Sequence, residues 1–192
     1  MDQMLPEPVV RMTQFYRQKD TGMQYRGTCG QTALAVCMAA ARGTPTDFEG
    51  VGELMHHLTR SMIVKEIAAP NGASRLAALA TQARDEGCAV TLELTYQEPM
   101  LADWLQILRD NAGAQPIVLQ VAHGEALTDA ETGAHDDVGL RYHAFAIVGQ
   151  RDGVFIAADS DNPDVMRRFQ CYTEATLTAA IPCGMLMLAM AR

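Results

Sequence analysis

The chain has 192 residues, 48% of them apolar, and a formal net charge of −8 at pH 7. This length and apolar content allow one full hydrophobic core, so we expect a single domain over residues 1–192, with residues 1–23 as an N-terminal arm. The negative charge argues against binding to nucleic acid or to an anionic membrane surface, because both need patches of Lys and Arg.

The first residues lack the positive and apolar regions of a signal peptide, and no stretch approaches the roughly 18 apolar residues of a membrane span. We therefore expect a cytoplasmic protein with no membrane partner, although export by a dedicated secretion system stays open. The five cysteines are an odd number without zinc-like spacing. They predict neither a disulfide framework nor a metal site, and no cofactor is implied.

The segment around Cys29 is the most informative part of the chain. Cys29 follows Thr28, a residue type suited to cap a helix, and it precedes an apolar run that predicts a helix over 29–41 ending at Gly43. A thiol in the first helical turn faces unpaired backbone N–H groups and the positive end of the helix dipole, which favours the nucleophilic thiolate. Cys29 is therefore the candidate nucleophile.

The middle of the chain alternates between helical and extended patterns. Helices are predicted at 47–58, capped by Thr46, at 73–86 and at 100–111, and strands at 89–96 and 117–121. Residues 123–140 are polar and contain glycine, so we expect a loop there. Loops of this length in a compact domain are usually functional or disordered.

A hairpin supplies partners for the thiol. Residues 141–149 read as a strand, 150–153 as a turn and 154–159 as the returning strand. His143 opens this hairpin and Asp159 closes it, so the two side chains are expected to be neighbours. Cys29, His143 and Asp159 form a candidate catalytic triad. Asp161 is the alternative third member, because Asp and Asn are also common where strands end.

The remaining elements complete an α+β layout. We expect strands at 165–172 and 185–190 with a helical turn over 173–180 between them. Helices then dominate the first half of the chain, and a mostly antiparallel sheet dominates the second.

The order of these motifs resembles that of the papain-like cysteine peptidases, in particular the bacteriocin-processing (double-glycine) peptidases and their free-standing relatives. The resemblance covers roughly residues 24–190, and its motifs are Cys-Gly-x-Thr-Ala-Leu-Ala at 29–35, Pro-Ile-Val-Leu at 116–119, His-x-Phe-x-Ile-Val-Gly at 143–149 and the strand that ends in Asp159. It implies a papain-like fold, with N-terminal helices packed on the C-terminal sheet.

The same resemblance implies a role for each candidate residue. Cys29 would be the nucleophile, His143 the general base and then acid, and Asp159 the residue that orients His143. Gln24 would donate to the oxyanion together with the backbone N–H of Cys29, although Gln24 lies one residue closer to the cysteine than is usual in the family.

These roles predict a cysteine peptidase that cleaves a protein or peptide substrate through an acyl-enzyme. A bacterial effector or toxin acting on a cytosolic protein, restrained by an immunity or inhibitor protein, would fit a small domain of this kind. The same thiol chemistry also supports a deamidase, a peptidoglycan amidase or an acyltransferase. A catalytically idle binding module on the same fold is the alternative from another class.

Overall fold

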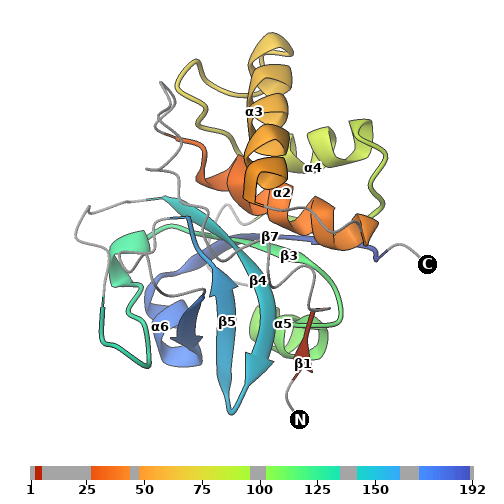
Figure 1. The fold of residues 1–192 in the computed structure, drawn as a ribbon. Helices are drawn as coiled ribbons and strands as arrows, with labels where there is room; N and C mark the ends of the chain where they lie inside the picture. Colours follow the sequence, from red (N-terminus) through yellow and green to blue (C-terminus); the bar gives the residue numbers. More distant parts are fainter. Residues whose placement is uncertain are drawn as a thin grey trace.

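A curved antiparallel sheet separates two groups of helices in the computed structural model (Figure 1). The structure describes residues 3–5, 27–43, 48–95, 103–134, 142–160 and 169–190. Its strands are β1 (Gln3–Met4), β2 (Val90–Thr95), β3 (Ile117–Val121), β4 (His143–Arg151), β5 (Val154–Ala158), β6 (Gln170–Thr173) and β7 (Pro182–Leu188). Its helices are α2 (Cys29–Arg42), α3 (Phe48–Val64), α4 (Leu76–Asp85), α5 (Trp104–Asn111) and α6 (Glu174–Ala179), with a 3₁₀ turn η2 (Gly124–Ala126).

The sheet runs in the order β2-β7-β3-β4-β5-β6, and each of its pairings is antiparallel. β1 pairs with the far end of β4, where Met4 lies opposite Gly149, beyond the reach of β3. Residues 3 and 4 of the expected arm are therefore extended. The expected α+β layout, with helices packed on a mostly antiparallel sheet, is confirmed.

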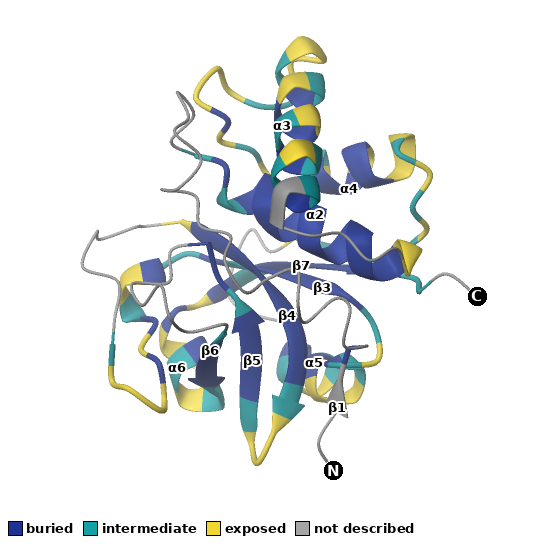
Figure 2. Ribbon diagram, in the orientation of Figure 1, coloured by how far each residue is buried: buried dark blue, intermediate teal, exposed yellow. Residues whose placement is uncertain are grey.

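Strand β4, which begins at His143, is buried on both faces of the sheet. Ala144, Ala146 and Val148 belong to the core beneath α2, α3 and α4, whereas Phe145 and Ile147 belong to the core beside α5 and α6. A strand covered on both faces reads as a continuous apolar run, which is how residues 144–148 appear in the sequence. Figure 2 follows this arrangement: the strands of the sheet are mostly buried, and exposed residues lie on the outer face of α3 and at the turn between β4 and β5.

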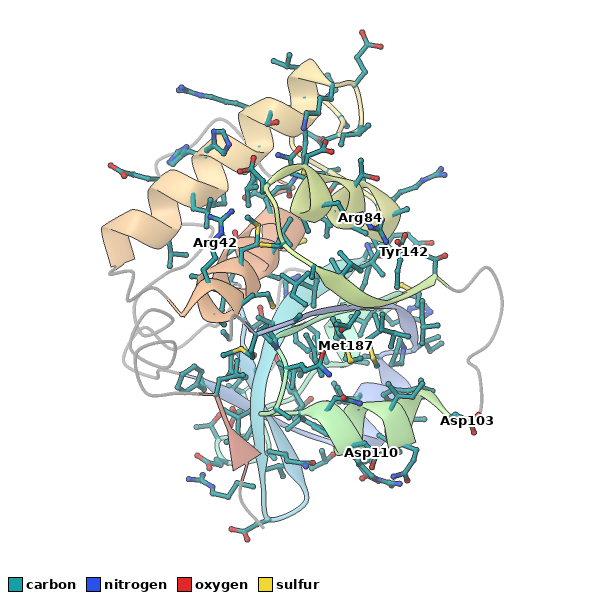
Figure 3. The ribbon with its side chains drawn as sticks, turned by 90° about the vertical axis from the view of Figure 1, so that its right-hand side faces the viewer. Arg42, Arg84, Asp103, Asp110, Tyr142 and Met187 are labelled. Carbon is teal, nitrogen blue, oxygen red and sulfur yellow. The ribbon has the colours of Figure 1, made fainter. Side chains whose placement is uncertain are left out.

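The sheet lies between the two helical layers. Figure 3 shows Arg42 and Arg84 in the layer of α2 and α4, and across the sheet Asp110 on α5 and Asp103 just before that helix. Met187 of β7 packs in the core on the α5 side. No helix in the described part of the chain is both long and apolar enough to cross a membrane.

α2 is enclosed by the other helices and the sheet. All of its residues from Gly30 to Ala41 are buried, which explains why its sequence is apolar around the whole helix and rich in alanine. The helix ends where the sequence predicts, because Gly43 adopts a left-handed conformation (φ 61°) and donates its N–H to the carbonyl of Ala40.

Several boundaries differ from the sequence prediction. α3 continues to Val64, beyond the expected end at residue 58. α4 begins at Leu76, because Ala73 and Ser74 are used in a turn in which the Ala69 N–H donates to the Ala73 carbonyl. β7 begins at Pro182, three residues before the predicted strand. Thr46, the expected cap of the second helix, lies outside the described residues.

Candidate active site

Cys29 is the first residue of α2 and is partly exposed. Thr28 occupies the expected N-cap position, but its side chain makes no capping hydrogen bond. Its carbonyl instead accepts from the backbone N–H and the hydroxyl of Thr32, at 2.8 Å and 2.9 Å. The N–H of Cys29 precedes this intrahelical ladder, as the first donors of any helix do, so it suits a substrate oxygen.

The turn before α4 supports the nucleophile segment. The Gly27 N–H donates to the carbonyl of Asn71 at 3.0 Å, and Nε2 of Gln31 donates to the carbonyl of Gly72 at 2.7 Å. A Cβ on Gly27 would lie 2.9 Å from the backbone nitrogen of Ala73, so the two backbones meet more closely than a side chain permits. Pro70, Asn71 and Gly72 are residue types that predict a turn, but the sequence does not show which segment this turn supports.

His143 and Asp159 meet where the hairpin predicts. Ala158 pairs with Ala146, so Asp159, the next residue, comes level with Phe145, two residues from His143 at the start of β4. Nε2 of His143 lies 2.6 Å from Oδ1 of Asp159, and both side chains are almost fully buried (2% and 3% exposed). An ionised carboxylate only accepts, so Nε2 carries the proton in this bond.

The pKa of His143 is set by opposing effects. Burial lowers it, but the negative charge of Asp159, the hydrogen bond to Asp159 and the interaction with the Cys29 side chain together raise it well above its ordinary value. Nδ1 has no hydrogen-bond partner of good geometry among the described residues. Since Nε2 is hydrogen-bonded to Asp159, Nδ1 is the ring nitrogen that is available to the thiol of Cys29.

The structure therefore brings together Cys29, His143 and Asp159, three of the four residues singled out from the sequence. Gln24 lies outside the described residues, as does Asp161, the alternative to Asp159. Sequence reasoning missed Tyr172, whose hydroxyl donates to Oδ2 of Asp159 at 2.8 Å. Strand alternation places Gln170 and Tyr172 on one face of the strand that follows Asp159, and that was the available signal.

Three of the other cysteines in the chain have thiols affected by burial. Burial raises the pKa of Cys37 above its usual range, and it raises the pKa values of Cys171 and Cys183 to about 11 each. These thiols are held protonated at neutral pH, which makes them poor nucleophiles.

The loop that precedes the histidine strand is ordered around Asp129. Oδ1 of this buried residue accepts from the N–H groups of Glu131 and Thr132, and Oδ2 accepts from the N–H of Cys171. The loop is thereby tied to β6, and residues 135–141 lie outside the described part. No group of three or more His, Cys, Asp or Glu side chains in the described ranges is arranged to hold a metal ion.

Similarity to known proteins is found at the level of structure and not of sequence. No family model matches the sequence, and no curated protein matches it. Among solved structures, a protein from Bacillus anthracis described as a C39-like peptidase matches with a TM-score of 0.60 and 13% identity, over 100% of this chain and 98% of the other. Pseudomonas avirulence protein AvrPphB matches with a TM-score of 0.34 and 11% identity, over 88% and 97%. The first likeness confirms, at the level of fold, the expected resemblance to papain-like peptidases.

Proposed function

We propose that this chain is a papain-like cysteine peptidase that hydrolyses peptide bonds with Cys29, His143 and Asp159. The observation that carries the proposal is the environment of the His143 ring. Nε2 of His143 is hydrogen-bonded to the buried carboxylate of Asp159. The ring also interacts with the thiol of Cys29, at the start of a buried helix. A histidine confined in this way has a fixed tautomer and one nitrogen available for proton transfer.

The proposed reaction proceeds through a thioester. Nδ1 of His143 takes the proton of the Cys29 thiol, and the thiolate attacks the substrate carbonyl carbon. The tetrahedral intermediate collapses as His143 gives the proton to the leaving amine, which departs. Water then attacks the thioester with His143 as base, the carboxylic acid leaves, and the thiol is restored. The raised pKa of His143 favours the imidazolium that the first step produces.

The oxyanion of each tetrahedral intermediate needs donors. The backbone N–H of Cys29 is the first, since it sits at the start of α2, where the helix dipole also favours negative charge. We propose the side chain of Gln24 as the second donor, as the resemblance to the family implies.

The first experiment incubates the protein with a mixed peptide library and follows the products by mass spectrometry. A peptidase gives new amino and carboxyl termini, whereas a deamidase releases ammonia and leaves the chain whole. Cys29→Ala is expected to lose turnover by about 10⁴-fold or more while keeping its fold. Cys37→Ala is the matched control, because it removes a buried thiol of the same helix, and it is expected to retain turnover. Unchanged turnover in Cys29→Ala would overturn the proposal.

The effector or toxin role, and with it an immunity or inhibitor partner, is a finer proposal that depends on the same thiol. Expression in the cytosol of a bacterial host is its direct test. We expect slowed growth with the wild-type chain and normal growth with Cys29→Ala at equal protein level. Normal growth with both would contradict this role and leave the peptidase proposal standing.

A further inference from the structure

We propose that Tyr172, supported by Gln170, is a positioning residue that fixes the carboxylate of Asp159 in its productive orientation. This inference rests on the proposed function, since it concerns how the orienting residue of the triad is itself held. No motif in the sequence marks Tyr172, which sits on β6, the edge strand next to β5.

The contact is direct and buried. Tyr172 lies opposite Phe155 in the β5–β6 pairing, and its side chain reaches along the sheet to the residue that follows β5. The hydroxyl donates to Oδ2 of Asp159 at 2.8 Å, in a residue that is 1% exposed. A hydrogen bond to a charged acceptor in such a place is about twice as strong as one between neutral groups.

The two oxygens of Asp159 thus have different partners. Oδ1 accepts from Nε2 of His143, and Oδ2 accepts from Tyr172. The terminal torsion of an aspartate is broad and nearly two-fold, so a carboxylate with one strong partner can still rotate about it. A second donor at the opposite oxygen restricts this rotation, and it thereby keeps Oδ1 directed at the imidazole.

The single proton of the Tyr172 hydroxyl indicates how Gln170 takes part. The Tyr172 hydroxyl also lies against the side-chain amide of Gln170, through the oxygen Oε1. A phenol has one proton, and the carboxylate is the stronger acceptor, so the amide satisfies the phenol best by turning to present Nε2 as a donor. In that arrangement Gln170 donates to Tyr172, Tyr172 donates to Asp159, and Asp159 accepts from His143.

Aromatic packing holds the phenol at the end of this chain of hydrogen bonds. The ring of Phe145 meets that of Tyr172 edge-on, with centroids 5.3 Å apart, and it lies 5.8 Å from the ring of His143. Phe145 thus packs against the rings of both Tyr172 and His143. The carboxylate of Asp159 connects the same two residues through hydrogen bonds. Buried polar chains of this kind gain strength when every member has a partner.

The test measures the rate at which iodoacetamide labels Cys29 at neutral pH, because this needs no substrate. The variants are Tyr172→Phe, Asp159→Asn and the double variant. We expect Asp159→Asn to slow labelling by at least about 10-fold and Tyr172→Phe by about 3- to 10-fold, since each weakens the imidazolium that pairs with the thiolate. The double variant should be no slower than Asp159→Asn alone, because Tyr172 acts through Asp159.

Thr59→Val is the matched control. It removes one buried hydroxyl, which donates to the carbonyl of Met55 in α3, without touching the hairpin. Its labelling rate should equal that of the wild type. If Tyr172→Phe does not fold, Gln170→Met, which removes the amide and leaves the phenol, should slow labelling in the same direction.

A second readout is the NMR signal of the proton on Nε2 of His143, which a short bond to a carboxylate moves downfield. We expect this signal to shift or broaden in Tyr172→Phe and to stay in place in Thr59→Val. An unchanged signal together with an unchanged or faster labelling rate in Tyr172→Phe would overturn the inference alone. An unchanged labelling rate in Asp159→Asn would instead overturn the proposed triad, and the inference with it.

Discussion

The two halves of the candidate site are held by different forces. On the nucleophile side, the segment around Cys29 is positioned mainly against the backbone of the turn before α4, which Gly27 approaches closely and to which the side chain of Gln31 donates a hydrogen bond. On the base side, His143 and Asp159 are positioned by hydrogen bonds among buried side chains. The first side tolerates little added volume, and the second tolerates little change of hydrogen-bonding groups.

This difference follows from what each half does in the proposed reaction. The thiol needs an exposed face for substrate, so it cannot be enclosed by its own partners, and rigid backbone around it supplies the precision. The imidazole must exchange protons while its orientation stays fixed, which a buried carboxylate achieves. Substitutions that act on one force should therefore affect one half and spare the other.

Among the substitutions that test this comparison, Asp159→Ala on the base side is expected to have the largest effect. It leaves a buried imidazole without its acceptor, so hydrolysis should fall by about 10²- to 10⁴-fold and the free energy of unfolding by about 1–3 kcal/mol. Peptide hydrolysis per folded molecule and chemical denaturation measure the two quantities.

Asp129→Ala is the control for Asp159→Ala. Asp129 is also a buried aspartate that accepts several hydrogen bonds, but it holds the loop before β4 rather than the histidine. We expect a similar loss of stability with little change in hydrolysis per folded molecule. Equal losses of hydrolysis in the two variants would mean that Asp159 acts through stability alone.

On the nucleophile side, Gly27→Ala should have the next largest effect. Its Cβ would meet backbone atoms of Ala73 at 2.9 Å and 3.1 Å, which cannot move without shifting the turn. We expect the free energy of unfolding to fall by about 1–3 kcal/mol and the alkylation of Cys29 to slow. Denaturation and peptide mass spectrometry test this.

Gly30→Ala provides the comparison for Gly27→Ala. Its Cβ would meet the end of the Leu79 side chain at 3.0 Å, and a methyl group can rotate away where a backbone atom cannot. The loss should therefore stay within about 1 kcal/mol, with alanine also favoured in a helix. A larger loss at Gly30 than at Gly27 would contradict the backbone-packing account.

The His143–Asp159 pair predicts a dependence of stability on pH. Because the pKa of His143 is raised in the folded state, folding binds a proton, and the added stability is fully present below the unfolded pKa of about 6.5. It is lost as pH rises through the folded pKa, with a slope of at most about 1.4 kcal/mol per pH unit. Thermal unfolding from pH 6 upward should show this loss in the wild type and a smaller one in His143→Gln. Equal pH profiles would contradict the pair.

The smallest effect is expected from Asp161→Ala. Since Asp159 already supplies the carboxylate that His143 contacts, removing Asp161 should change hydrolysis by less than about twofold. Steady-state kinetics of this variant beside Asp159→Ala decides between the two aspartates. A loss as large as that of Asp159→Ala would assign the role to Asp161.

The parts of the site that follow local patterns were predictable from the sequence. The helix after Cys29 has a continuous apolar run and a glycine stop, and the hairpin has two apolar strands around a tight turn. Strand geometry alone then makes His143 and Asp159 neighbours. The boundaries of β3, at Ile117 and Val121, agree with the prediction for the same reason.

The rest depends on contacts between distant segments. Asn71 and Gly72 read as an ordinary turn, and their bonds to the nucleophile segment arise from how α4 packs on α2. Tyr172 reads as a strand residue, and its place beside Asp159 depends on the register of β6 against β5. Thr28 has the right residue type for a side-chain cap, yet its hydroxyl makes no capping hydrogen bond.

The central claim is that His143 activates Cys29, and the pH dependence of Cys29 alkylation tests it most directly. Peptide mass spectrometry would follow labelling of all five cysteines in the wild type and in His143→Ala. The account predicts that Cys29 of the wild type labels ahead of the other thiols at about pH 6–7, and that this advantage disappears in His143→Ala. Slow labelling of Cys29 in both proteins would contradict the account and favour an idle binding module on the same fold.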